Sequence, residues 1–290
     1  MKAYEKNFRH KHSLGQNFII DEFLLEDIAD ESGISKDDYV LEIGPGNGAL
    51  TRCLLDRSKY VLAVEVDKSL MPLLKDNLKS YENLTIINAD FLTYDFQNII
   101  SDFEANGFDK KNNHIKVVAN LPYYITSLII NQLLLNPYIS EMTLMVQKEV
   151  AERIVAKPGG RDYGILTLSC NYFSETSLLM IVSKKCFDPI PKVDSAVVHF
   201  KKHADIIDLS NNDVFHIEDN ENYKKLFSLI KASFSQRRKK LVNSLINVGG
   251  YDKDTLLKAF AKNNFDENIR AENLSLDDYI KLLSTISIQK

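Results

Sequence analysis

The sequence lacks the features of a membrane, secreted or zinc-binding protein. No apolar run approaches the roughly 20 residues of a membrane-spanning helix, and no long apolar region of the signal-peptide kind follows the basic N-terminus. Only three cysteines occur, Cys53, Cys170 and Cys186, with neither an even count nor a metal-ligand spacing. Structural disulfides and bound metal are therefore poorly supported, and we expect a cytoplasmic protein.

A strongly basic composition, the usual mark of a nucleic-acid-binding protein, is also missing. The net charge is −4, which by itself argues against a polyanionic partner. The charges are unevenly placed, however: acids gather between 205 and 221, whereas Lys231, Arg237, Arg238, Lys239 and Lys240 have no acid among them. This basic run is either a surface that binds RNA or a solvated helix face.

The length of 290 residues and the 44% hydrophobic content are those of a globular protein with two domains. Strand patterns alternate with helical ones up to about Lys202, which predicts a mostly parallel sheet with helices on both faces. The last strand, 196–200, follows another strand without an intervening helix, so we expect it to run antiparallel at or near the edge. The polar stretch 97–113 is expected to be a surface connection.

Beyond about Lys202 the strand patterns stop, and four short helical patterns follow, at 223–234, 239–247, 255–262 and 276–283. We therefore expect an α/β domain over residues 1–202, with a basic N-terminal arm, and a small all-helical domain over residues 203–290.

Glycines follow the first predicted strand in the sequence Gly44-Pro45-Gly46-Asn47-Gly48. Such glycines let the backbone turn tightly and approach a ligand, and an acid at the end of the next strand can accept both ribose hydroxyls. Glu65 has the spacing expected of that acid; Asp67 is its rival, or the N-cap of the next helix. A structural strand-to-helix turn would leave the same glycine pattern.

A buried strand ends abruptly at Asn120-Leu121-Pro122-Tyr123. Pro122 has no N–H for a sheet, so Asn120 and Tyr123 are expected at the mouth of the sheet. An amide oxygen, a neighbouring carbonyl and a flat ring suit a planar base with an exocyclic amine. A plain strand-ending turn is the alternative.

The order of these features favours an S-adenosylmethionine-dependent methyltransferase acting on a nucleobase amine over a dehydrogenase. Asp90, at the end of the third strand, is a candidate acceptor for the adenine amino group of the cofactor, or simply a solvated acid. No histidine is assigned a catalytic role.

Six ordered motifs give the chain a more specific resemblance. It resembles the small-subunit ribosomal RNA adenine N6,N6-dimethyltransferase family, often called KsgA-like, over nearly its whole length. The motifs begin at Leu14, Glu42, Asn120, Gln147, Phe187 and Phe234 and read LGQNF, EIGPG, NLPY, QKEV, FxPxPKVDSAV and FxQRRK.

The resemblance implies a Rossmann-like methyltransferase sheet with a small C-terminal all-helical domain. It implies methyl transfer from S-adenosylmethionine to N6 of two adjacent adenines in the 3′-terminal hairpin of 16S rRNA, by a monomer that acts on a pre-ribosomal small subunit. The implied cofactor contacts are Asn17, Ile19 (leucine in the family), Gly44, Gly46, Glu65, Asp90 and Asn120. The implied catalytic residues are Asn120, Leu121, Pro122 and Tyr123, with Phe187 as a second face for the base.

The RNA-binding residues expected from charge placement are Arg9, Lys11, Lys231, Arg237, Arg238, Lys239 and Lys240. Two other functions compete with this prediction. A methyltransferase of the antibiotic-resistance type would act on the large ribosomal subunit, and Leu121 with the block from Phe187 to Val197 disfavours it. A non-catalytic assembly or transcription factor would not need the intact glycine loop, Asn120 and Tyr123.

Overall fold

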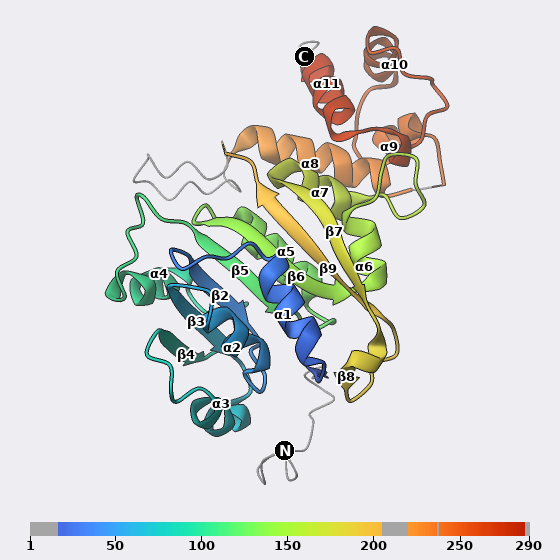
Figure 1. Cartoon of the computed structure of the whole chain (residues 1–290). Coiled ribbons are helices and arrows are strands. Elements are labelled where there is room, and N and C mark those ends of the chain that lie inside the picture. The colour runs from blue at the N-terminus through green and yellow to red at the C-terminus, as the bar shows by residue number, and fades with distance from the viewer. Residues whose placement is uncertain (1–16, 205–219, 237, 288–290) are drawn as a thin grey trace. The chain divides into compact units, whose positions relative to one another are not determined.

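The computed structural model describes residues 17–204, 220–236 and 238–287 (Figure 1). Arg9, Lys11 and Arg237 lie outside the described residues. Among those described, 17–151 and 174–204 form one compact unit, here called the sheet unit, and the rest form a second, the helical unit. The predicted α/β sheet followed by C-terminal helices is confirmed. The helical unit also takes in residues 152–173, while a functional boundary at residue 202 stays a prediction.

The sheet unit is built on a seven-stranded sheet of order β4-β3-β2-β5-β6-β9-β7. The strands from β4 to β6 pair in parallel, and β9 is antiparallel to both β6 and β7. The prediction of an antiparallel last strand near the edge is thus confirmed, with β7 at the edge itself. The bounds are β2 (Tyr39–Ile43), β3 (Tyr60–Glu65), β4 (Leu84–Asn88), β5 (Ile115–Asn120), β6 (Ile139–Gln147), β7 (Ser174–Val182) and β9 (Ser195–Lys202).

A separate two-stranded pair joins the start of the described chain to a loop far along the sequence. In this pair β1 (Phe18–Ile19) runs antiparallel to β8 (Phe187–Asp188), with Ile19 opposite Phe187. The backbone N–H of Ile20 extends the pairing by donating to the Cys186 carbonyl at 2.9 Å. This pair holds residues 17–19 beside the sheet.

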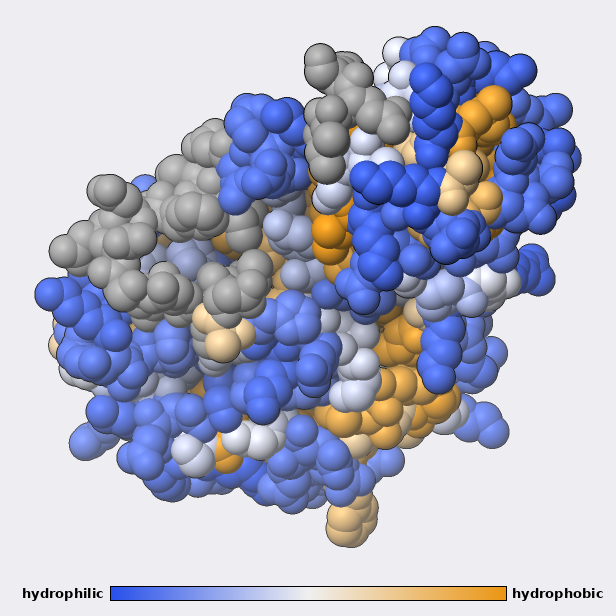
Figure 2. Space-filling model, turned by 90° about the horizontal axis from the view of Figure 1, so that it is seen from above, coloured by the Kyte–Doolittle hydropathy of each residue, from blue (hydrophilic) through white to orange (hydrophobic). Residues whose placement is uncertain are grey.

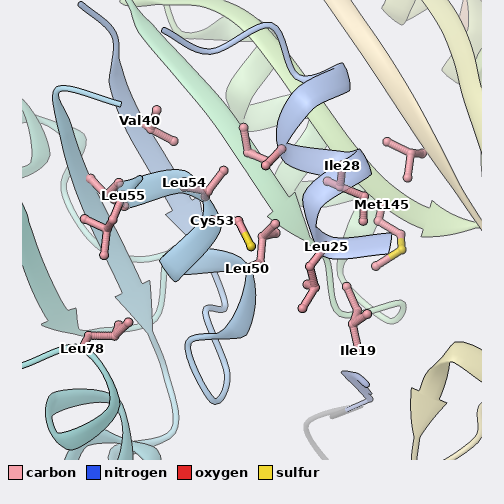
Figure 3. Close-up of a cluster of buried hydrophobic side chains, with 14 of the residues drawn as sticks. Ile19, Leu25, Ile28, Val40, Leu50, Cys53, Leu54, Leu55, Leu78 and Met145 are labelled. Atoms are coloured by element: carbon pink, nitrogen blue, oxygen red, sulfur yellow. The ribbon is translucent and has the colours of Figure 1, made fainter. Parts of the chain in front are cut away.

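Helices pack on both faces of the sheet, with α1 and α2 in front and α5 behind in the view of Figure 1. Leu25 of α1 and Leu50 of α2 point toward one another in the core cluster of Figure 3. The bounds are α1 (Glu22–Glu31), α2 (Ala49–Leu55), α3 (Met71–Asn77) after the 3₁₀ turn η3 (Lys68–Leu70), α4 (Phe96–Ala105), α5 (Thr126–Leu135) and α6 (Lys148–Ile154). A further 3₁₀ turn, η4 (Lys184–Cys186), precedes β8.

The prediction that 97–113 is only a surface connection is wrong, because its first part is helix α4. The Asp95 side chain caps the helix by accepting from the Gln97 N–H at 2.9 Å. Ile99 and Phe103 are fully buried, and the Phe103 ring meets the Tyr39 ring edge-on with centroids 5.9 Å apart. The helix was not predicted because this stretch has few apolar residues among many polar ones. The spacing of those apolar residues nevertheless fits one face of a helix.

The helical unit has its own apolar core, to which Tyr163, Leu229, Phe260 and Tyr279 contribute. Two buried tyrosines tie it together, because Tyr163 Oη donates to the Leu274 carbonyl at 2.9 Å and Tyr279 Oη to the Ala271 carbonyl at 3.0 Å. The elements are α7 (Ile165–Phe173), α8 (Glu221–Phe234), α9 (Leu241–Asn247), α10 (Lys253–Lys262), the 3₁₀ turn η6 (Ala271–Asn273) and α11 (Leu276–Ser287).

The surface in Figure 2 is mainly hydrophilic, with apolar side chains exposed in smaller areas. None of the helices in the described part of the chain is long and apolar enough to cross a membrane.

Replacing Phe103 by alanine is expected to lower the free energy of unfolding of the sheet unit by about 3–5 kcal/mol, because it leaves a cavity beside Tyr39 and Phe108. Phe23→Ala is the matched control, since Phe23 is 85% exposed on α1 and its loss should change stability by less than about 0.5 kcal/mol. Urea unfolding of both variants measures the difference, and equal losses would contradict the packing role given to α4.

Candidate active site

A cavity of about 180 Å³ lies where the parallel strands of the sheet unit end. Its walls come from the glycine loop after β2, the end of β3, the segment after β4, the segment after β5 and β1. The cavity is thus at the carboxyl edge of the sheet, where α/β proteins bind their ligands. The predicted residues that line it are Asn17, Ile19, Gly44, Gly46, Glu65, Asp90, Asn120, Leu121, Pro122 and Tyr123.

The glycine loop needs its glycines for both conformation and space. Gly46 has φ of +62°, in the left-handed region that disfavours other residues. A Cβ on Gly46 would also lie 2.7 Å from Cε1 of Phe18, which is too close. Only glycine therefore fits at position 46, where the backbone of the loop lines the cavity.

Glu65 is held at the end of β3 with its carboxylate against the glycine loop. Its Oε2 accepts from the Gly46 N–H at 3.2 Å, and its Oε1 accepts from the Asp67 N–H at 2.7 Å. Burial raises the pKa of this carboxyl, while these two hydrogen bonds favour the charged form. Asp67 caps η3 by accepting from the Ser69 N–H at 3.0 Å, so the prediction that it is a helix cap is confirmed.

Asn120 ends β5 with its amide group oriented by a hydrogen bond. Its Nδ2 donates to the Asn17 backbone carbonyl at 3.2 Å. The amide oxygen is therefore the atom of this side chain left to accept from a ligand. Leu121 still pairs with β6 by donating its N–H to the Met145 carbonyl at 3.1 Å, and Pro122 then ends the strand.

Tyr123 follows directly, and its ring is half-buried in the cavity wall. Its hydroxyl shares a hydrogen bond of 2.8 Å with Oγ of Ser195, a buried residue of β9. Burial raises the pKa of Tyr123, so the phenol is neutral near pH 7, and the hydrogen bond to Ser195 anchors the ring.

Of two further predicted site residues, Asp90 has the solvated position that the sequence allowed, whereas the burial of Phe187 was not indicated. Asp90 is exposed at the cavity rim, and its Oδ1 accepts from the Leu92 N–H at 3.0 Å. Phe187 is only 1% exposed and belongs to the core cluster that contains Ile19 and Leu25. Its ring does not line the cavity, so its role as a stacking face stays a prediction.

Several lining residues were missed by sequence reasoning. Val66, Phe91 and Leu92 give the cavity an apolar part beside Glu65 and Asp90. Their signal was their position next to the strand-end acids. Glu42 was placed in a predicted strand and in the motif EIGPG, but no role in the site was assigned to it. It is 1% exposed, and its Oε2 has no hydrogen-bond partner.

The predicted RNA-binding residues that the structure describes are all in the helical unit. Lys231 is exposed on α8, and Arg238, Lys239 and Lys240 are exposed between α8 and α9. Their role in RNA binding stays a prediction. No group of three or more acidic, histidine or cysteine side chains suited to a metal ion occurs in residues 17–204, 220–236 and 238–287.

Comparison with known proteins gives a family match over almost the whole chain. The family model described as "Ribosomal RNA adenine dimethylase" matches residues 7–287. Ribosomal RNA small subunit methyltransferase A of Clostridium acetobutylicum is 40% identical over 97% of this chain and 95% of its own length. The protein of the same name from Geobacillus thermodenitrificans is 41% identical, over 96% of this chain and 92% of its own length.

Two solved structures resemble the chain over nearly its full length. The 23S rRNA methyltransferase ErmE has a TM-score of 0.68 at 26% identity and covers 93% of this chain and 100% of its own. A dimethyladenosine transferase from Plasmodium falciparum has a TM-score of 0.72 at 24% identity, with 94% and 98% covered, which supports the fold.

The buried Glu42 makes stability depend on pH in a defined window. Burial raises its pKa from 4.5 to about 8, and the charge of Glu65 adds to the rise. As the pH rises from 4.5 to 8, Glu42 loses its proton in the unfolded chain but keeps it in the folded one, so the folded state binds more protons and becomes less stable.

Glu42→Gln removes this titration, so the variant should be more stable than the parent at pH 8, by on the order of 3 kcal/mol, and lose less stability between pH 5 and 8. Urea unfolding at the two pH values measures it. The exposed Glu31→Gln is the control, and a Glu42→Gln variant that keeps the parent's pH dependence would contradict this account.

Proposed function

The chain belongs to the ribosomal RNA adenine dimethylase family, and we propose that it transfers methyl groups to N6 of two adjacent adenines in the 3′-terminal hairpin of 16S rRNA. It is an S-adenosylmethionine-dependent rRNA adenine dimethyltransferase with a role in small-subunit biogenesis. The observation that carries the proposal is the cavity that the glycine loop, Glu65 and the segment from Asn120 to Tyr123 line together.

The residues of this cavity fit S-adenosylmethionine, which supplies an electrophilic methyl group when bound. The backbone of Gly44 and Gly46 would let the cofactor approach closely, and the Glu65 carboxylate would accept hydrogen bonds from the ribose hydroxyls. Asp90 would accept from the adenine amino group, beside the apolar side chains of Val66 and Phe91. Asn17, Ile19 and Asn120 would hold the rest of the cofactor. The hydrogen bonds that hold Glu65 against the glycine loop support this fit, because they favour the charged form of the acceptor.

The target amine of adenine is a weak nucleophile because its lone pair is delocalised into the ring. We assign the acceptors of its two hydrogens to Asn120 Oδ1 and the Leu121 carbonyl, which favours a pyramidal nitrogen with a directed lone pair. The hydrogen bond from Asn120 Nδ2 to Asn17 supports this role, because it fixes the amide before the base arrives. No strong base is needed, since the methylated cationic amine loses its proton readily to water.

The base itself is held by stacking on Tyr123. Pro122 ends the strand directly before this residue and so leaves Tyr123 in the cavity wall. The bond between the Tyr123 hydroxyl and Ser195 supports a fixed ring. Phe187 remains the proposed second face, and stacking on it requires a shift of the β1–β8 pair, because the ring is buried. The adenine has to leave its stack to enter, which is cheapest in a loop or single strand.

RNA docking is assigned to Lys231, Arg237, Arg238, Lys239 and Lys240, with Arg9 and Lys11 of the N-terminal arm. Phosphate contacts of this kind position the RNA without reading its sequence. The substrate is rRNA, and we propose further that the protein acts as a cytoplasmic monomer on a pre-ribosomal small subunit.

Methyl transfer to purified ribosomal subunits tests the function directly. Incubation with labelled S-adenosylmethionine and undermethylated small subunits should yield N6,N6-dimethyladenosine in 16S rRNA, detected by mass spectrometry. The likeness to a 23S rRNA methyltransferase makes large-subunit RNA the second candidate. Product in 23S rRNA alone would favour that candidate, and no product in either would favour a non-catalytic binder.

Glu65→Ala should weaken S-adenosylmethionine binding by about 1.5–3 kcal/mol, because the ribose hydroxyls lose a charged acceptor. Asp67→Ala is the matched control, since that carboxylate caps η3. Calorimetry measures both. A Glu65→Ala variant with parental affinity beside a weakened Asp67→Ala variant would move the ribose contact to Asp67.

Tyr123→Ala should keep the cofactor yet lose most methyl transfer, because stacking on a base contributes about 1–3 kcal/mol and the ring also sets the angle of attack. Tyr123→Phe loses only the bond to Ser195 and should retain much more of the rate. Single-turnover assays at saturating RNA compare them. Equal rates for the parent and Tyr123→Ala would show that the segment from Asn120 to Tyr123 only ends a strand and does not hold the base.

A further inference from the structure

The helical unit contains a second cavity, which the proposed chemistry does not use. It is an open groove of about 520 Å³ between one face of α8 and the end of α9. This volume falls within the roughly 300–1,000 Å³ of small-molecule sites. The side chains on the α8 face include Tyr223, Lys224, Phe227, Ser228 and Lys231, and Val248 and Gly249 form the other side.

The floor of the groove is aromatic and ordered. The rings of Tyr223 and Phe227 lie 4.6 Å apart between centroids, tilted by 38°. Tyr172 packs edge-on against Phe227 at 5.6 Å and supports the pair from within the unit. Across from them Val248 is 54% exposed, so its side chain is open to a ligand in the groove. Tyr223 is half-buried and Phe227 only 6% exposed, so the apolar surface open to a ligand comes mainly from Tyr223 and Val248.

The groove also carries positive charge without any acid among its lining residues. Lys224, Ser228 and Lys231 occupy positions i, i+4 and i+7 of α8 and therefore share one face of the helix. Both lysines are exposed. Two ammonium groups along an apolar groove complement a ligand that has flat rings and repeated negative charges.

We propose that this groove binds an unpaired nucleotide of the RNA substrate, with its base against Tyr223 and Val248 and its phosphates at Lys224 and Lys231. The inference rests on the proposed RNA substrate and adds a base-contacting site to the phosphate contacts of the basic run. Single strands suit such a site because unstacked bases can lie on aromatic rings, whereas duplex RNA hides its base faces.

Binding of a fluorescent 12-nucleotide oligoadenylate and of a 12-base-pair RNA duplex, by anisotropy across a salt series, tests the proposal on the full chain. Lys224→Gln/Lys231→Gln should bind the single strand about tenfold or more weakly at 0.1 M salt, with the slope of log K against log salt reduced by about 1.4. The control, Lys253→Gln/Lys258→Gln, removes two exposed lysines of α10 in the same unit.

Val248→Glu tests the base contact, because it places an anion in the groove at an exposed position that should not affect folding. It should weaken single-strand binding at least as much as the double lysine variant, while Ile280→Glu, at an exposed position of α11, should not. Circular dichroism confirms that all variants are folded. The duplex should lose less affinity than the single strand in both groove variants.

The outcomes separate this inference from the proposed function. If the parent methylates small-subunit RNA and both groove variants bind oligoadenylate as their controls do, the groove assignment alone is overturned. If the single strand and the duplex lose affinity equally, or if an oligoglutamate of the same length binds equally well at the groove, base recognition is overturned. Absence of methyl transfer by the parent would instead overturn the proposed function.

Discussion

Parallel pairing of β2, β3, β4 and β5 is the constraint on which the site depends, because it brings the ends of these strands to one edge of the sheet. Each strand then delivers one chemical group there: the glycine loop from β2, Glu65 from β3, Asp90 after β4 and Asn120 from β5. Pro122 secures the last of these, since it has no N–H to continue pairing with β6.

Two sets of hydrogen bonds turn this edge into an ordered cavity. The Glu65 carboxylate joins the glycine loop to the segment after β3 through the Gly46 and Asp67 N–H groups. The Asn120 amide joins the end of β5 to residue 17, which the β1–β8 pair holds beside the sheet. These hydrogen bonds orient the acceptors assigned to the cofactor and the base, which is the arrangement that catalysis by positioning needs.

Much of the sheet and of the site could be predicted from the sequence because the relevant signals are local. Strands followed by glycine, acid or proline mark the edge, and Glu65, Asn120 and Tyr123 all line the cavity. The features that the sequence did not indicate depend on tertiary contacts. Helix α4 is recognisable once Phe103 packs on Tyr39, and the burial of Phe187 follows from a pairing with β1 that sequence spacing does not reveal.

Glu42 also could not be assigned to the site from the sequence, because only the fold places this acid of β2 beside Glu65 in the cavity wall. The groove along α8 is a similar case. In the sequence, its lysines and aromatic residues are those of an ordinary amphipathic helix. The groove forms only because the chain after α9 places Val248 and Gly249 opposite them.

The most direct test of the central claim is the rate of single-turnover methyl transfer by Asn120→Asp with saturating RNA and cofactor. The substitution keeps the shape and an acceptor oxygen but removes the N–H that donates to the Asn17 carbonyl. The account predicts a fall of about 100-fold or more at saturating cofactor, in line with the loss of a positioned hydrogen-bonding group. A rate within twofold of the parent would show that the orientation of this amide does not govern catalysis.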